Sequence, residues 1–175
     1  MAGGADPWGI SCTRYWQGAL MDATRWEQLV SGNECPFDVP RPDSNEHWDV
    51  VGSLKTSTLY LTKSQTYRGH CLLIFDVRHA TRPDQLSMDE WTSFCADLYR
   101  AEGVISHIVK PDHINVAALG NVIPHLHWHI VPRYYDDPRW GAPIWMTNLE
   151  DMDQRRLCDA EHGKLLRELK VVLAS

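Results

Sequence analysis

The sequence lacks a long hydrophobic run and a cluster of basic residues, and each absence excludes a class of protein. No stretch approaches the ~18 consecutive apolar residues of a membrane-spanning helix. The net charge is −6 and no run of Lys or Arg occurs, which disfavours binding to a nucleic-acid polymer or an anionic membrane. Residues 1–10 also lack the basic and apolar segments of a signal peptide. We therefore expect a cytoplasmic protein, in which a nucleotide could still bind at one local site.

Paired cysteines are also missing. The five cysteines are odd in number and scattered, and they form no Cys-x-x-Cys pair. This usage is typical of reduced thiols in a cytoplasm and not of a disulfide framework. Internal repeats and low-complexity segments are absent as well, and a chain of 175 residues fits one domain. The cysteines are Cys12, Cys35, Cys71, Cys95 and Cys158.

The order of predicted helices and strands indicates an α+β fold. Two capping boxes, Thr24 with Glu27 and Ser87 with Glu90, predict where two helices begin. Apolar residues recur at helical spacing after the second box and again near the C-terminus. We expect helices at 24–31, 88–107 and 153–173, and strands at 48–54, 58–61, 70–75, 114–119 and 125–131. Strands grouped around a central helix predict an antiparallel sheet of about five strands with a long central helix and a C-terminal helix.

The most informative segment holds three histidines at alternate positions, His125, His127 and His129. Alternate side chains of a strand point to the same face, so the three imidazoles are expected on one face and the apolar residues between them in a core. Three imidazoles in a row have no packing role, because each would need its own hydrogen-bond partner if it were buried. The pattern therefore favours chemistry over structure.

Two kinds of chemistry use such histidines, and a metal site is the first. At about 3.3 Å per residue, the Cα atoms of His125 and His129 lie roughly 13 Å apart, too far for both side chains to reach one ion easily. Two neighbouring histidines could bind zinc with a third ligand from elsewhere, but no His-Glu-x-x-His pattern is present. The second kind is covalent and acid–base chemistry, in which a neutral imidazole acts as the nucleophile.

The segment from His125 to Val131 resembles the signature of the histidine-triad (HIT) family, in which histidine alternates with apolar residues. Residues 114–124 resemble the strand and phosphate loop before the triad, and residues 68–74 and 78–79 resemble the family's Gly-His and Arg-His elements. Residues 132–145 are similar to the tail of a bacterial subgroup described as diadenosine-polyphosphate hydrolases. The resemblance implies one HIT-like domain over 1–175, with an N-terminal extension (1–33), a HIT core (34–145) and a C-terminal helical tail (146–175).

The resemblance also implies roles for the histidines and an activity. His127 would be the nucleophile, His125 and His129 would bind phosphate oxygens, and His70 would complete the catalytic group. The implied activity is hydrolysis at the α-phosphorus of a dinucleoside polyphosphate or a related nucleotide conjugate, through a nucleotidyl-histidine. The alternatives are a nucleotidyltransferase or phosphoramidase of the same family, or a catalytically silent nucleotide-binding regulator. A homodimer is expected.

The nucleotide-binding residues and the cofactors are implied in the same way. Asn115 would contact the phosphate or ribose, and Gly120 and Asn121 would form the phosphate loop. Val122 stands where the family often has a Ser or Thr that assists the leaving group. No cofactor is required, although magnesium could arrive with a polyphosphate. Some relatives carry a zinc site that begins with Cys-x-x-Cys and would continue near His79 and His125. Because this sequence has Cys35-Pro-Phe-Asp38 there, we expect a plain loop and no metal.

Overall fold

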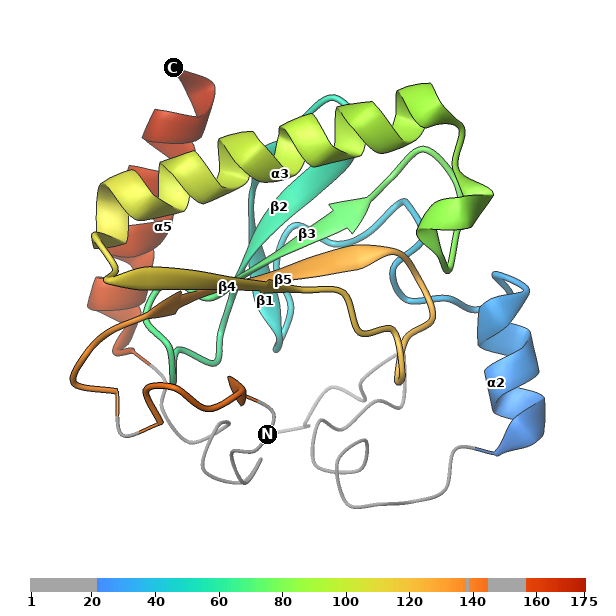
Figure 1. The fold of residues 1–175 in the computed structure, drawn as a ribbon, viewed down its shortest axis with the longest axis horizontal. Helices are drawn as coiled ribbons and strands as arrows, with labels where there is room; N and C mark the ends of the chain where they lie inside the picture. The colour runs from blue at the N-terminus through green and yellow to red at the C-terminus, as the bar shows by residue number, and fades with distance from the viewer. Residues whose placement is uncertain (1–21, 138, 145–156) are drawn as a thin grey trace, which may run out of the picture.

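The computed structural model describes residues 22–137, 139–144 and 157–175, which form the predicted α+β fold (Figure 1). The helices are α2 (Ala23–Val30), α3 (Met88–Val109) and α5 (Asp159–Ala174), with a 3-10 turn at Pro83–Gln85. The strands are β1 (Trp48–Ser53), β2 (Ser57–Thr62), β3 (Cys71–Phe75), β4 (His113–Ala117) and β5 (His127–Arg133). Among the described residues, no helix has the length and apolar character needed to cross a membrane.

The five strands form one antiparallel sheet in the order β1-β2-β3-β5-β4. The register of the two inner strands β3 and β5 sets Leu72 opposite His129 and Ile74 opposite His127. The edge strand β4 places Ala117 opposite His129. The histidines of β5 therefore lie near the middle of the sheet, between β3 and β4.

The main core lies between one face of the sheet and the two long helices. Helix α3 runs across this face, and α5 packs against both α3 and β1 (Figure 1). The period of two along β5 decides which side chains enter the core: Ile130 is buried there and Trp128 packs against it, whereas His127 and His129 point to the opposite face. Fully buried members of this core include Leu59, Leu61, Leu73, Phe75, Phe94, Ile105 and Leu169.

A buried carboxylate joins α3 to the turn between β1 and β2. Asp97 accepts hydrogen bonds from the backbone N–H of Lys55 (3.2 Å) and of Thr56 (2.8 Å). It also accepts from the hydroxyls of Thr56 (2.7 Å) and Ser57 (2.8 Å). The side chain is 5% exposed, so these four donors replace the water that a carboxylate would otherwise bind.

The structure corrects several predicted boundaries. Ser87 caps α3 and Glu90 completes the box, as predicted, but α2 is capped by Asp22, whose side chain accepts from Thr24 N, and not by Thr24. Strand β5 spans 127–133 and not 125–131, so His125 lies before the strand. Helix α5 begins at Asp159, and residues 153–156 of the predicted helix lie outside the described residues. The remaining elements differ from their predicted bounds by one or two residues.

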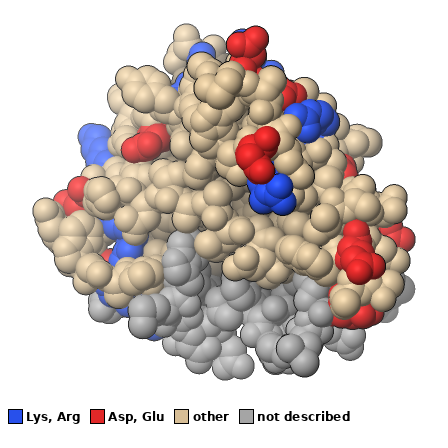
Figure 2. Space-filling model, turned by 45° about the vertical axis from the view of Figure 1, so that its right-hand side comes forward, with Lys and Arg blue, Asp and Glu red and all other residues tan. Residues whose placement is uncertain are grey.

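On the face that Figure 2 shows, the charged side chains of the described residues do not gather by sign. In the view of Figure 2, single Lys, Arg, Asp and Glu side chains lie scattered among neutral ones. This distribution agrees with the absence of a basic run from the sequence.

Candidate active site

Three histidines lie in a row on the sheet face that points away from α3. His127 Nε2 lies 3.3 Å from His129 Nε2, and His129 Nδ1 lies 3.3 Å from His70 Nε2. The first two come from β5, and His70 comes directly before the neighbouring strand β3. The structure therefore brings together His70, His127 and His129, three of the four histidines that the sequence singled out.

A backbone oxygen fixes the protonation of His127. Its Nδ1 lies 2.6 Å from the carbonyl oxygen of His125, which can only accept a hydrogen bond. In the neutral ring the proton must therefore be on Nδ1, and Nε2 carries a lone pair. The arrangement makes Nε2 of His127 the atom with nucleophilic character.

The same logic assigns the protons of the next two rings. Because His127 Nε2 is an acceptor, His129 must donate to it from its own Nε2. The Nδ1 of His129 is then an acceptor, and His70 donates to it from Nε2. One consistent set of neutral tautomers thus runs from His70 through His129 to His127 and ends on the backbone.

The protein favours the neutral form of each ring. Burial lowers the pKa of His70 from 6.5 to about 4 and also lowers the pKa of His127. Burial, with further contributions from His70 and His127, holds the pKa of His129 well below 6.5. All three rings are therefore neutral at pH 7, and the lone pair of His127 remains available.

A buried glutamine and a glycine position the backbone of His70 next to the row of histidines. Gln65 Oε1 accepts from the backbone N–H of Gly69 at 2.7 Å, and Gln65 Nε2 donates to the backbone oxygens of Thr62 (2.8 Å) and His70 (3.3 Å). Gly69 has φ of +91°, and a Cβ atom there would lie 2.9 Å from a methyl group of Val109. Both the backbone angle and the close approach to α3 require glycine before His70.

The loop after α2 contributes an aromatic side chain that packs against His127, and the sequence did not predict this contact. The ring of Phe37 lies edge-on against His127, with 5.0 Å between ring centroids, and Trp48 packs on its other side at 5.7 Å. Arg41 holds this loop in place by donating to the backbone oxygen of Phe37 and to the Asp76 carboxylate. No local pattern could have revealed these contacts, because they depend on the path of a proline-rich loop.

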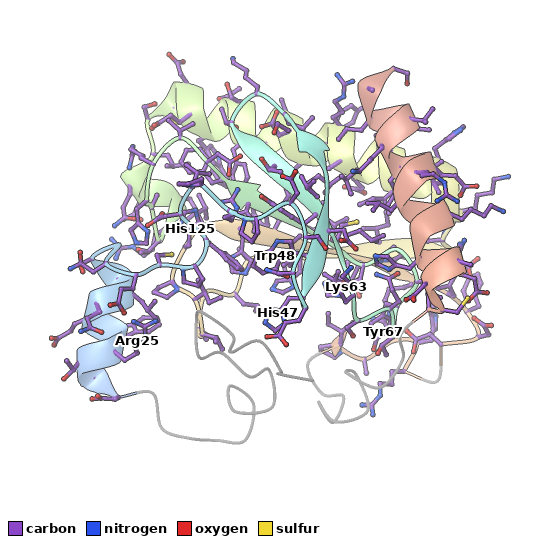
Figure 3. All side chains as sticks on the ribbon, turned by 180° about the vertical axis from the view of Figure 1, so that it is seen from behind. Arg25, His47, Trp48, Lys63, Tyr67 and His125 are labelled. Atoms are coloured by element: carbon purple, nitrogen blue, oxygen red, sulfur yellow. The ribbon has the colours of Figure 1, made fainter. Side chains whose placement is uncertain are left out.

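The side chain of His125 is directed away from this row. Its Nε2 donates to the backbone oxygen of Phe75 at 2.7 Å, and its Nδ1 lies 3.2 Å from Asp38 Oδ1 and 3.7 Å from Cys35 Sγ. With His79, these side chains form a cluster whose four ligand atoms all lie within 4.8 Å of one another. Figure 3 shows His125 on the side of the sheet nearer to α2.

The donor set of this cluster fits a zinc ion. His79 Nε2 lies 3.2 Å from the backbone oxygen of Val30 and must donate to it, so in the neutral ring Nδ1 is an acceptor, and this atom faces Asp38 Oδ1 at 3.2 Å. The Nδ1 of His125 faces the same carboxylate in the same way, and burial lowers the pKa of His125 to about 4. With both rings neutral, two lone pairs and a carboxylate repel one another, and a cation between them would remove that repulsion.

Zinc ligands at 2.0–2.3 Å in a tetrahedron are separated by roughly 3.3–3.8 Å, close to the spacings in this cluster. Burial raises the pKa of the Cys35 thiol to about 11, and a bound ion would displace its proton. An ion held by Cys35, Asp38, His79 and His125 would tie the loop after α2 to the sheet. The expected plain loop at 35–38 stays untested, but the geometry favours the ion.

Metal analysis of single variants tests the cluster. We expect protein expressed with zinc to carry about one ion per chain, and Cys35→Ser or Asp38→Ala to lose most of it, because each removes one of four ligands. Cys158→Ser is the matched control, since Cys158 is exposed and remote from the cluster. Equal zinc content in Cys35→Ser and wild-type protein, measured by mass spectrometry of the metals, would contradict the assignment.

The three predicted nucleotide-binding residues lie on the edge strand and the loop after it. Asn115 of β4 is on the same face as His129, and its Oδ1 accepts from Arg133 at 2.7 Å. Gly120 has φ of +74°, a backbone conformation that favours glycine in the loop between β4 and β5. Asn121 is exposed in that loop. The structure therefore places Asn115 beside the row of histidines but shows no contact of Asn121 with it among the described residues.

Comparison with known proteins agrees with this architecture. Two histidines on an inner strand of an antiparallel sheet and a third just before the neighbouring strand, with helices on the other face, form the arrangement expected of the histidine-triad class. The HIT domain model matches residues 44–136, more than half of the chain, and the protein belongs to this family. No curated protein matches the chain.

Similar solved structures are themselves histidine-triad proteins. One from Bradyrhizobium japonicum is 26% identical with a TM-score of 0.65, and the match covers 73% of this chain and 92% of that one. One from Marinobacter aquaeolei VT8 is 22% identical with a TM-score of 0.63, covering 73% and 90%. A zinc-bound family member from Mycobacterium smegmatis is 19% identical with a TM-score of 0.52, covering 85% and 91%.

Proposed function

We propose that this protein is a nucleotide hydrolase that cleaves at the α-phosphorus of a dinucleoside polyphosphate or a related conjugate and releases a nucleoside monophosphate. The observation that carries the proposal is the hydrogen bond from His127 Nδ1 to the backbone oxygen of His125. It leaves the Nε2 lone pair of a neutral imidazole as the nucleophile without a separate general base.

In the first step a phosphate takes the place of the contact between His127 and His129. The Nε2–H of His129 then donates to a phosphate oxygen, and His127 Nε2 faces the phosphorus. A bond forms between Nε2 and phosphorus while the bond from phosphorus to the bridging oxygen breaks. The leaving nucleoside polyphosphate keeps the electron pair of that bond. His70 holds the His129 ring in the donating tautomer throughout.

In the second step water attacks the phosphorus of the nucleotidyl-histidine. The nitrogen–phosphorus bond breaks, its electron pair returns to His127 Nε2, and the proton of the water passes to solvent. Both steps are accelerated by positioning of the reacting groups and by neutral hydrogen-bond donors to the phosphate oxygens. We propose that no metal is needed at the row of histidines, and that magnesium enters only as the counterion of a polyphosphate.

Val122, which stands where the family often has a Ser or Thr, favours a leaving group of low pKa. An amine must gain a proton as it departs, and Val122 has no group that can supply one. A nucleoside polyphosphate departs as an anion without that help. We expect kcat/KM for diadenosine tetraphosphate to exceed that for adenosine phosphoramidate at least tenfold, about 1.4 kcal/mol in barrier height.

A matched variant separates this effect from general damage to the site. Val122→Ser restores a hydroxyl and is expected to raise the phosphoramidate rate while leaving the tetraphosphate rate nearly unchanged. A tenfold preference of the wild-type protein for the phosphoramidate would overturn the argument from Val122. In the same assay, transfer of the nucleotide to added inorganic phosphate would identify a transferase, and binding without turnover would identify a regulator.

A further inference from the structure

Arg133, the last residue of β5, is a buried arginine that neither the sequence nor the proposed chemistry accounts for. It is 3% exposed and stacks over the ring of Tyr67, at 5.1 Å from the centroid. Its Nε donates to Asp137 at 2.6 Å, and its terminal nitrogens donate to the backbone oxygens of Ala142 (3.1 Å) and Arg139 (2.7 Å). These bonds tie the segment after β5 to the sheet. Figure 3 shows Tyr67 toward the α5 end of the molecule and His125 toward the α2 end.

The remaining bond of Arg133 reaches the predicted nucleotide site. Its Nη1 donates to Asn115 Oδ1 at 2.7 Å. A guanidinium group has five N–H donors and no acceptor, so the atom of Asn115 that faces it must be the oxygen and cannot be the nitrogen. The amide of Asn115 is therefore held in one of its two possible orientations, with Nδ2 directed away from Arg133.

Among the described residues, Asn115 has an unused N–H donor and lines a cavity next to β4. In the part of the chain that the structure describes, Asn115 Nδ2 has no hydrogen-bond partner. Asn115 lines a cavity of about 670 Å³ beside β4, which Trp140 and Pro143 border on the other side. It also shares a sheet face with His129, whose neighbour across the strands is Ala117. A nucleotide that extends from the histidines along β4 would thus meet the N–H donor of Asn115, which lies on the same sheet face opposite Val131.

We propose that Arg133 is a positioning residue, which locks the Asn115 amide so that Nδ2 donates to a phosphate or ribose oxygen of the bound nucleotide. This inference rests on the proposed function. Arg133 itself is not the phosphate ligand, because four of its five N–H groups are already bonded inside the protein and Asp137 balances its charge. The anion is recognised by a neutral amide whose direction a buried cation sets.

The orientation can be tested without changing Arg133. The probe is adenosine monophosphate, and the measurement is its dissociation constant by calorimetry. Asn115→Ala removes the donor and is expected to weaken binding about tenfold, since one hydrogen bond to a charged group is lost. Asn115→Asp keeps the partner of Arg133 but sets a carboxylate oxygen where Nδ2 was, so we expect binding to be weaker than in Asn115→Ala. Binding equal to or tighter than in Asn115→Ala would overturn the orientation.

A double-mutant cycle tests whether Arg133 affects nucleotide binding through Asn115. Arg133→Met is expected to weaken binding about tenfold in the wild-type background and less than twofold in the Asn115→Ala background. Asp137→Asn is the matched control, because it loosens the segment after β5 while the bond from Arg133 to Asn115 remains, and it should stay within about twofold of wild type. Melting temperatures show which variants fold. If Arg133→Met does not fold, the comparison of Asn115→Ala with Asn115→Asp still tests the orientation of the amide.

Each outcome has one meaning. Additive losses in the cycle, or a loss in Asp137→Asn as large as in Arg133→Met, would show that Arg133 acts only as an anchor and would overturn the inference while the proposed function stands. A wild-type protein that binds no nucleoside monophosphate would overturn the proposed function and this inference with it.

Discussion

His127→Asn is expected to lower kcat at least about a thousandfold while leaving the affinity for adenosine monophosphate within a few fold of wild type. The asparagine amide can still donate to the backbone oxygen of His125, so the strand and the neighbouring rings keep their places. It has no lone pair on nitrogen that can attack phosphorus. The variant should therefore bind the nucleotide and fail in the first chemical step.

Two measurements make this result specific. Acid quenching of the wild-type reaction with a radiolabelled dinucleotide should trap a nucleotide on the protein, and the same treatment of His127→Asn should trap none. His107→Asn, an exposed histidine on α3, is the control and should match wild type in both assays. A His127→Asn protein that retains more than about a tenth of the wild-type rate would refute the assignment of the nucleophile.

Asp97→Ala is expected to destabilise the protein by about 4 kcal/mol or more. The substitution leaves two backbone N–H groups and two hydroxyls at the turn between β1 and β2 without their acceptor. Each buried donor left unsatisfied costs about 1–3 kcal/mol, and the whole domain is expected to have only about 5–15 kcal/mol of stability. Much of the protein should be unfolded at 37 °C.

Urea unfolding followed by tryptophan fluorescence measures this difference. Asp89→Ala removes an exposed carboxylate from the first turn of the same helix and should cost less than about 1 kcal/mol. An equal change in the free energy of unfolding for the two variants would show that the four hydrogen bonds of Asp97 contribute nothing specific.

Local signals in the sequence predicted most of the fold. The Ser87 and Glu90 box and the helical spacing behind it located α3, and the alternation of histidine with Trp128 and Ile130 predicted the two faces of β5. These elements were predictable because their determinants lie within a few residues of one another. The start of β5 was wrong by two residues because the alternation continues through His125, while pairing with β3 extends only from Ile74 to Cys71.

The residues of the site were predictable only where they lie close together in the sequence. Alternation identified His127 and His129, but its prediction that His125 shares their face was wrong, because His125 lies before the strand and contacts Asp38 instead. The family resemblance added His70. The supporting residues come from other segments and carry no periodic signal: Arg133 contacts Asn115 on the neighbouring strand, and Phe37 reaches His127 from the loop after α2. A buried arginine or a loop phenylalanine has the same appearance in a sequence whether or not it touches a site, so only the folded arrangement reveals its role.

Because His127 Nδ1 bonds to the backbone oxygen of His125, the motif needs the backbone of His125 at the active site but not its side chain. A carbonyl group is present whatever amino acid occupies the position, so the protonation of His127 is indifferent to the side chain at 125. The imidazole of His125 lies instead beside Cys35, Asp38 and His79. The side chains of His127 and His129 therefore belong to the row at the candidate active site, whereas the side chain of His125 belongs to the cluster that would anchor the loop after α2, and one short stretch of chain contributes to both.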